Sequence, residues 1–168
     1  PSALKDAVDD MSSKLHANLE KALPQIQETY EKSDSRPLVQ FFEGAKGVMH
    51  VFDDVVKSLK PGEIFYRYTS ENDLERANSY LPKHYRQMRD QKKLVRLVIS
   101  NPGSGKQKQP RLERFIKYIP NDLDMFDQNI IQLIYGDKVA FIDLSTESSV
   151  IIENKRLADF QKVIFKGF

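Results

Sequence analysis

The chain has 168 residues, of which 40% are hydrophobic and 30% charged, which is enough for one domain with its own core plus an appendage. Twenty-six Lys and Arg against 24 Asp and Glu leave a net charge of +2, too balanced to predict nucleic-acid binding by this chain itself. The chain has no cysteine, which excludes disulfides, thiolate metal sites and cysteine nucleophiles. It also lacks an apolar run of about 18 residues, so we predict no membrane-spanning helix. We therefore expect a cytoplasmic protein.

The first predicted element is an amphipathic helix within residues 1–33, followed by a linker that ends at Pro37. Its apolar residues recur in steps of three and four: Leu4, Val8, Met11, Leu15, Leu19, Leu23, Ile26 and Tyr30. This spacing places them on one face of a helix, and such a face needs a partner surface. We expect a connector helix, cut from an upstream module, that pairs with a second copy of itself through its first five apolar residues. Packing on its own domain is the alternative.

Residues 34–168 are predicted to form an α/β domain, a mixed sheet with flanking helices. Gly136-Asp137 between two apolar runs is a hairpin signal, and the continuous apolar run LVRLVIS predicts a strand inside the sheet. The predicted strands are Leu38–Phe42, Glu63–Thr69, Leu94–Ser100, Leu112–Ile119, Asn129–Tyr135, Lys138–Leu144 and Ser149–Ile152. The predicted helices are Ala45–Leu59, Asn72–Gln91 with a kink at Pro82, and Asn154–Phe165.

Apolar spacing also predicts which side of each helix faces the sheet. In the helix over Ala45–Leu59 the inward residues are expected to be Val48, Val51, Phe52, Val55 and Leu59. In the closing helix they are expected to be Leu157, Phe160, Val163 and Ile164.

No catalytic or cofactor motif is evident. Residues 101–106 (NPGSGK) follow a strand but lack the first Gly and the hydroxyl residue of a phosphate-binding loop, and Pro110 prevents a helix from opening behind it. The three histidines, His16, His50 and His84, lie on separate predicted helices without partners at metal-ligand spacing. We therefore expect no metal, no cofactor and no enzymatic activity.

Several sequence blocks together resemble the C-terminal effector region of TrmB-type transcriptional regulators. They are Arg36–Gly44 (RPLVQFFEG), Gly47–Asp54 (GVMHVFDD), Ile131–Ile142 (IQLIYGDKVAFI) and Val150–Asn154 (VIIEN), and the resemblance extends from about Leu15 onward. It implies a phospholipase D-like domain behind a linker or dimerisation helix. It also implies a homodimer that binds DNA through an N-terminal winged helix-turn-helix, which is missing from these residues.

The resemblance further implies that phosphodiester hydrolysis is lost. Phospholipase D enzymes carry a His-x-Lys-x4-Asp signature with His as the nucleophile. On this hairpin Asn129 falls at the His position, Ile131 at the Lys position and Gly136 at the Asp position. Without the imidazole and the lysine there is neither a nucleophile nor a phosphate clamp.

An effector pocket, if used, is expected near the strand ends, as in other open α/β sheets. The candidate ligand-binding residues are Arg67, Tyr68, Ser70, Arg96, Ser100, Asn101, Asn129 and Gln132. Ordinary strand-end and turn residues would look the same, and the two mid-strand arginines would more often face solvent or pair with an acid. The sequence thus favours an effector-sensing domain. A diverged phosphodiesterase and a protein-interaction module without a small ligand stay open as alternatives.

Overall fold

The computed structural model describes residues 36–70, 73–100, 114–119 and 129–167, and the isolated positions 14, 18 and 20; for residues 74, 75 and 114 it describes only the backbone. The chain divides into two units, Pro1–Pro37 and Leu38–Phe168. Lys14, Asn18 and Glu20 are helical and exposed. The predicted pairing residues Leu4, Val8, Met11, Leu15 and Leu19 lie outside the described residues, so the helix pairing stays a prediction.

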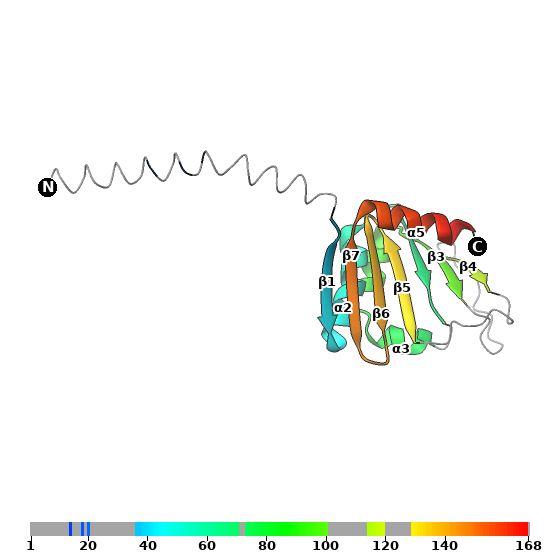
Figure 1. Cartoon of the computed structure of the whole chain (residues 1–168). Coiled ribbons are helices and arrows are strands. Elements are labelled where there is room, and N and C mark those ends of the chain that lie inside the picture. Colours follow the sequence, from blue (N-terminus) through cyan, green and yellow to red (C-terminus); the bar gives the residue numbers. More distant parts are fainter. Residues whose placement is uncertain are drawn as a thin grey trace. The chain divides into compact units, whose positions relative to one another are not determined.

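The second unit is built on a seven-stranded mixed sheet, which confirms the predicted α/β class (Figure 1). Across the sheet the order is β1-β7-β6-β5-β2-β3-β4, in which β2, β3 and β4 run parallel and all other neighbours antiparallel. The strands are β1 (Leu38–Glu43), β2 (Ile64–Tyr68), β3 (Val95–Ser100), β4 (Arg114–Tyr118), β5 (Ile130–Tyr135), β6 (Lys138–Asp143) and β7 (Ser148–Glu153). The hairpin predicted at Gly136-Asp137 joins β5 to β6, and β3 has neighbours on both sides, as its apolar run predicts.

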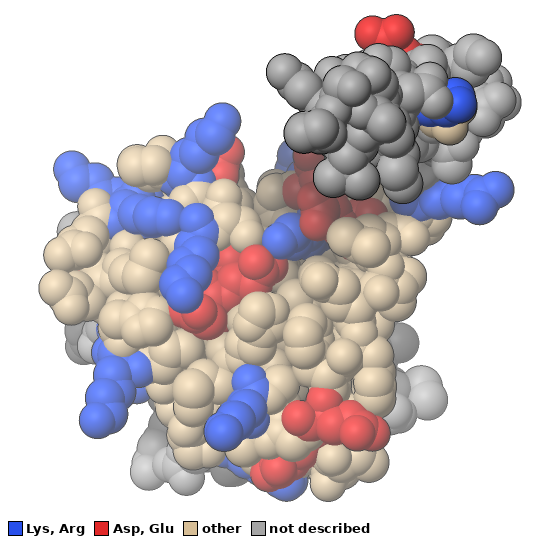
Figure 2. Space-filling model, turned by 90° about the vertical axis from the view of Figure 1, so that its left-hand side faces the viewer, with Lys and Arg blue, Asp and Glu red and all other residues tan. Residues whose placement is uncertain are grey.

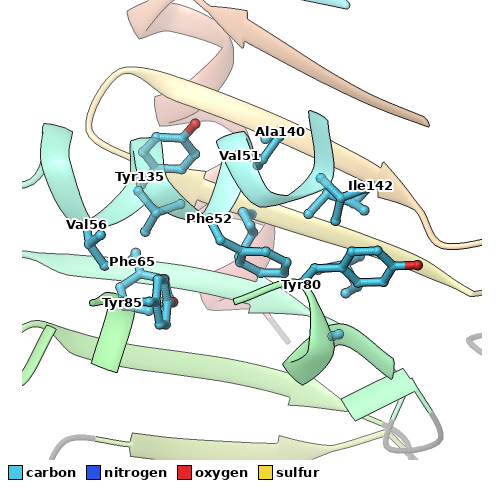
Figure 3. Close-up of a cluster of buried hydrophobic side chains, with 14 of the residues drawn as sticks. Val51, Phe52, Val56, Phe65, Tyr80, Tyr85, Tyr135, Ala140 and Ile142 are labelled. Atoms are coloured by element: carbon cyan, nitrogen blue, oxygen red, sulfur yellow. The ribbon is translucent and has the colours of Figure 1, made fainter. Parts of the chain in front are cut away.

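Helix α2 (Gly44–Ser58) covers one face of the sheet with the side predicted from its spacing. Val48, Val51, Phe52 and Val55 are fully buried there, beside Phe65, Tyr85 and Tyr135 (Figure 3). The helix lies close to β1 because Gly47 has no side chain: a Cβ at this position would lie 2.7 Å from the Cβ of Phe42. At the carboxyl end of α2, the Lys92 ammonium donates to the carbonyls of Val56 and Leu59, at 2.7 Å each.

The single kinked helix predicted over Asn72–Gln91 is wrong. The chain forms two short helices instead, α3 (Asp73–Ser79) and α4 (Tyr85–Gln91). Between them lies Pro82, which has no backbone N–H and disfavours helical geometry at the residue before it. Two such effects on adjacent residues are enough to separate the helices, and α4 restarts with a hydrogen bond from the Tyr85 N–H to the Pro82 carbonyl at 2.9 Å.

Helix α5 (Lys155–Gly167) lies on the other face of the sheet, where it contacts β5 and β6. The predicted inward residues are wrong, because Leu157, Phe160, Val163 and Ile164 are all exposed. The buried residues are Ala158 and Phe165. Phe165 packs edge-on against Tyr66 and Tyr68 of β2, with ring centroids 4.9 Å apart in both pairs. The helix therefore has two apolar sides, and the side with fewer large residues faces the sheet.

Candidate functional site

Polar side chains gather at the carboxyl ends of the parallel strands β2 and β3. The chain continues past β2 in register, with the Thr69 N–H donating to the Ile99 carbonyl at 3.1 Å. The Ser100 hydroxyl donates to the Thr69 carbonyl at 2.7 Å. Thr69, Ser70 and Ser100 are almost completely buried beside the strand ends.

Arg67 carries the positive charge of this edge. Its side chain is only 4% exposed, which corrects the sequence-based view that it would more often face solvent. Its Nη2 donates to the Thr69 hydroxyl at 3.3 Å, and the guanidinium lies 6.0 Å from the Phe52 ring centroid. Within the described part of the chain its Nε has no hydrogen-bond partner. A buried guanidinium donor that lacks an acceptor is the kind of group that an anionic or carbonyl-bearing ligand satisfies.

Neighbouring charges determine how well that buried cation is tolerated. Burial lowers the pKa of Arg67, while nearby Tyr85 and Asp73 act in the opposite direction. Asp73, at the first turn of α3, is 2% exposed and thus places a buried carboxylate near the guanidinium. Burial raises the pKa of Tyr85, and the charges of Arg96, Arg67 and Arg89 offset part of that rise. Three arginines therefore act electrostatically on the buried phenol of Tyr85, the first residue of α4.

The structure separates the predicted ligand residues onto two faces. Arg67 pairs with Leu133 across β2 and β5, and both lie on the α2 face. Tyr68 pairs with Gln132 on the α5 face, where the Gln132 amide donates to Gln161 at 3.0 Å. Burial raises the pKa of Tyr68 to about 12. Tyr68 and Gln132 therefore do not join Arg67 in one site.

The remaining predicted residues are distributed along the edge and beyond it. Ser70 is buried directly after Thr69, and its carbonyl accepts a hydrogen bond from the Thr69 hydroxyl at 3.2 Å. Asn129 precedes β5 with a φ of 56°, and its carbonyl accepts from the Leu144 N–H at 2.9 Å, so it fixes the start of the hairpin. Arg96 pairs with Phe65 near the amino end of β3, away from the carboxyl ends of the strands where Arg67 lies. Asn101 lies outside the described residues.

Sequence reasoning misses Thr69 and Asp73. Thr69 falls in a predicted strand as an ordinary β-former, and Asp73 at a helix start is typical of a cap. No signal in either residue type indicates that both are buried beside Arg67.

Two further polar clusters connect α2 to its neighbours. Asp54 accepts hydrogen bonds from the Tyr135 hydroxyl at 2.8 Å and from the Lys138 ammonium at 2.9 Å. Asp53 lies 2.6 Å from both the Lys57 ammonium and the His84 ring, a partner that sequence spacing does not indicate for His84. Burial acts to raise the pKa of Asp53, but the hydrogen bonds from Lys57 and His84 lower it overall. Both clusters join helices to the sheet or to each other.

The described segments contain neither a candidate metal-binding cluster nor a membrane-spanning helix. Across them, no three His, Asp or Glu side chains are grouped to hold a metal ion. None of the helices that the structure describes is long and apolar enough to span a membrane.

Comparison with known proteins shows a distant structural likeness to a solved structure. No family model and no curated protein matches the sequence. A solved structure of TrmBL2, an archaeal chromatin protein described as showing a novel mode of DNA binding, aligns with 98% of this chain at a TM-score of 0.47 and 16% identity. The alignment covers 66% of the TrmBL2 chain, so the present chain spans just under two thirds of that protein.

Proposed function

We propose that this chain is the non-enzymatic effector-sensing and dimerisation region of a TrmB-like transcriptional regulator. Residues 38–168 would sense a small molecule or a partner, and residues 1–33 would connect them to a DNA-binding domain that these residues do not include. The support is the order of the sequence blocks that resemble this family, combined with an α/β domain that contains the β5–β6 hairpin.

One observation supports the sensing role most directly, the buried guanidinium of Arg67. It lies at the carboxyl edge of the parallel strands with the hydroxyls of Thr69 and Ser100, and its Nε lacks an acceptor among the described residues. Ligands of open α/β sheets bind at this edge. We therefore expect an effector that carries a carboxylate or phosphate group, since a guanidinium donates best to a charged oxygen.

The residues at the three signature positions support the proposal of a domain without hydrolytic activity. Asn129, at the nucleophile position of the resemblance, bears an amide, which is not a nucleophile. Ile131, at the lysine position, is completely buried in the core under α2. Gly136 is part of the hairpin turn with a φ of 53° and has no side chain that binds an ion. We therefore propose that the residues at these three positions do not support the phospholipase D reaction.

Effector binding would act through β1, which directly follows the proposed connector segment. In a homodimer, a change in geometry at the sheet would alter the spacing of two DNA-binding heads. An effector shifts that equilibrium only by the difference in its affinity for the two arrangements.

The test is a thermal-shift screen with phosphate monoesters, dicarboxylates and neutral sugars, followed by calorimetry on each hit. Arg67→Met should weaken binding of an anionic hit by about tenfold or more, because it removes the charged donor. Arg86→Met, which changes an exposed arginine of α4, is the matched control and should leave binding unchanged. Absence of any hit would favour an interaction module without a small ligand.

A parallel assay addresses the enzymatic alternative. The wild-type chain should not turn over a generic aryl phosphodiester. Turnover that is lost in Asn129→Ala would overturn the non-enzymatic proposal and favour a diverged phosphodiesterase.

A further inference from the structure

The sheet face beneath α5 is only partly covered. Helix α5 shields β2, β5 and β6, where Tyr66, Ile134 and Val139 are buried, but it leaves β1 and β7 open (Figure 1). We call this open region, together with the neighbouring Phe141 of β6 and the exposed apolar side of α5, the apolar corner. Its residues are Val39, Phe41, Phe141, Val150, Ile152, Leu157, Phe160 and Ile164.

Strand register makes the sheet part of the apolar corner continuous. Val39 pairs with Ile152, and Phe41 pairs with Val150, which in turn pairs with Phe141. Phe141 belongs to the cluster under α5, so all of these residues lie on the α5 face of the sheet.

The helix part joins the sheet part through Gln161. Leu157, Gln161 and Ile164 lie on one side of α5 because they are spaced by four and three residues. Gln161 accepts a hydrogen bond from Gln132 at 3.0 Å, and Gln132 is the neighbour of Phe141 across β5 and β6. The side of α5 that carries Leu157 and Ile164 therefore overhangs the open row of the sheet, and helix and sheet meet at an angle.

The size of the apolar corner indicates an interface. Phe41 is 63% exposed, Phe160 61% and Val39 58%. The largest apolar patch on a typical monomer measures about 300–600 Å², and such patches are often functional. Each partner in a standard stable interface contributes about 800 Å².

Charges of opposite sign lie at the two ends of the apolar corner. Glu43 is on the same face of β1 as Phe41, at the end that pairs with Ser148, and Asp143 also pairs with Ser148 from the other side. Arg156 lies on α5, which begins just after Glu153, at the opposite end of β7. Both Glu43 and Arg156 are exposed, and Figure 2 shows much surface that is neither acidic nor basic between the charged groups on the β1 side.

We infer that the apolar corner binds a second copy of this chain about a two-fold axis that runs across the strands. Such an axis places the α5 end of one copy over the Glu43 end of the other. Each α5 then covers its partner's open sheet, and Arg156 of each copy faces Glu43 of the other. A two-fold interface must be complementary to itself, and an apolar surface with an acidic and a basic end meets that condition. The inference deepens the proposed dimeric regulator and rests on it for the role of the dimer.

Sedimentation of the full chain tests the apolar part. Phe160→Glu and Phe41→Glu should each raise the dimer dissociation constant by about tenfold or more, because a charge is placed in the interface core. Phe115→Glu is the matched control: Phe115 is an exposed phenylalanine on β4, at the far edge of the same sheet. Circular dichroism establishes that all three variants keep their fold.

Crosslinking tests the geometry, and a chain without cysteine allows it without background. Glu43→Cys chains mixed with Arg156→Cys chains should form a disulfide-linked pair on mild oxidation. Lys57→Cys, at an exposed position of α2 on the other side of the sheet, should not link to Arg156→Cys.

The outcomes separate the two proposals. A dimer that Leu15→Glu dissociates but Phe160→Glu does not, without the Glu43–Arg156 link, would overturn the apolar corner and leave the connector helix as the interface. A wild-type monomer at high concentration would overturn both modes of dimerisation. A crosslinked dimer that binds no effector would support the apolar corner and contradict the sensing role.

Discussion

The hydroxyl of Tyr135, on β5, donates a 2.8 Å hydrogen bond to the carboxylate of Asp54, on α2. Lys138 donates to the same carboxylate from the next strand. Burial acts to raise the pKa of Asp54, yet the hydrogen bonds from Lys138, Tyr135 and Ser58 lower it below its ordinary value. One partly buried acid thus holds the first long helix of the sheet domain on the central hairpin.

This arrangement predicts a specific dependence of stability on pH. Because the pKa of Asp54 is lower in the folded than in the unfolded chain, its contribution is fully present above about pH 4 and is lost as the pH falls through the folded value. Asp54→Asn should cost about 1–3 kcal/mol at pH 7 and flatten the acid limb of the stability curve. Urea unfolding between pH 2 and 7 measures this, with exposed Asp137→Asn as the control. An unchanged acid limb in Asp54→Asn would contradict the role assigned to this carboxylate.

Lys92 should stabilise the end of α2. Its ammonium donates to the Val56 and Leu59 carbonyls, which have no partner within the helix itself. Lys92→Met keeps the aliphatic stem but removes the donor, and should lower the free energy of unfolding by about 1–2 kcal/mol. Chemical denaturation of this variant beside Lys60→Met, a change at an exposed lysine two residues after the helix, isolates the capping effect. Equal losses in both variants would indicate that the cap contributes nothing.

Gly47 should not tolerate a side chain. A Cβ there would meet the Cβ of Phe42 at 2.7 Å, so α2 or β1 would have to move. We expect Gly47→Ala to destabilise the fold by about 1–3 kcal/mol despite the better helix propensity of alanine. Gly167→Ala, where nothing lies within 4 Å of the added Cβ, should be neutral or slightly stabilising. Thermal melts compare the two, and a neutral Gly47→Ala would show that the helix can shift at little cost.

The two sides of α5 should differ in their contribution to stability. Phe165 is 8% exposed and packs against two tyrosines, whereas Val163 is well exposed. Phe165→Ala should cost about 3 kcal/mol or more, and Val163→Ala less than about 0.5 kcal/mol. Denaturant titration measures both values. A larger loss for Val163→Ala than for Phe165→Ala would instead support the inward side that apolar spacing predicts.

Sequence patterns predict this fold best where short-range preferences decide the structure. Turn chemistry at Gly136-Asp137 and the continuous apolar run before Ser100 are of this kind, and the structure confirms both predictions. The orientation predicted for α5 is wrong because the helix has two apolar sides, and spacing alone does not indicate that small Ala158 allows the closer approach. A prediction based on the number of large apolar side chains selects the side of α5 that is exposed in the structure.

The candidate site is predicted only in part, for a similar reason. A strand-end location and Arg67 itself follow from the sequence, but alternation along β2 places Tyr68 on the opposite face of the sheet. The buried carboxylate of Asp73 depends on how α3 returns over the strands, which no local pattern encodes. Long-range packing determines which polar groups meet.

The burial of Ile131 has a consequence for any attempt to install phosphodiester chemistry on this scaffold. A lysine at that position would have to hold its ammonium under α2 among aliphatic and aromatic side chains, at a cost of several kcal/mol. A histidine in place of Asn129 would therefore lack the neighbouring lysine that binds phosphate in the signature. Re-engineering hydrolysis would require the core beneath α2 to be redesigned first, so single substitutions at the hairpin would not be enough to introduce that reaction.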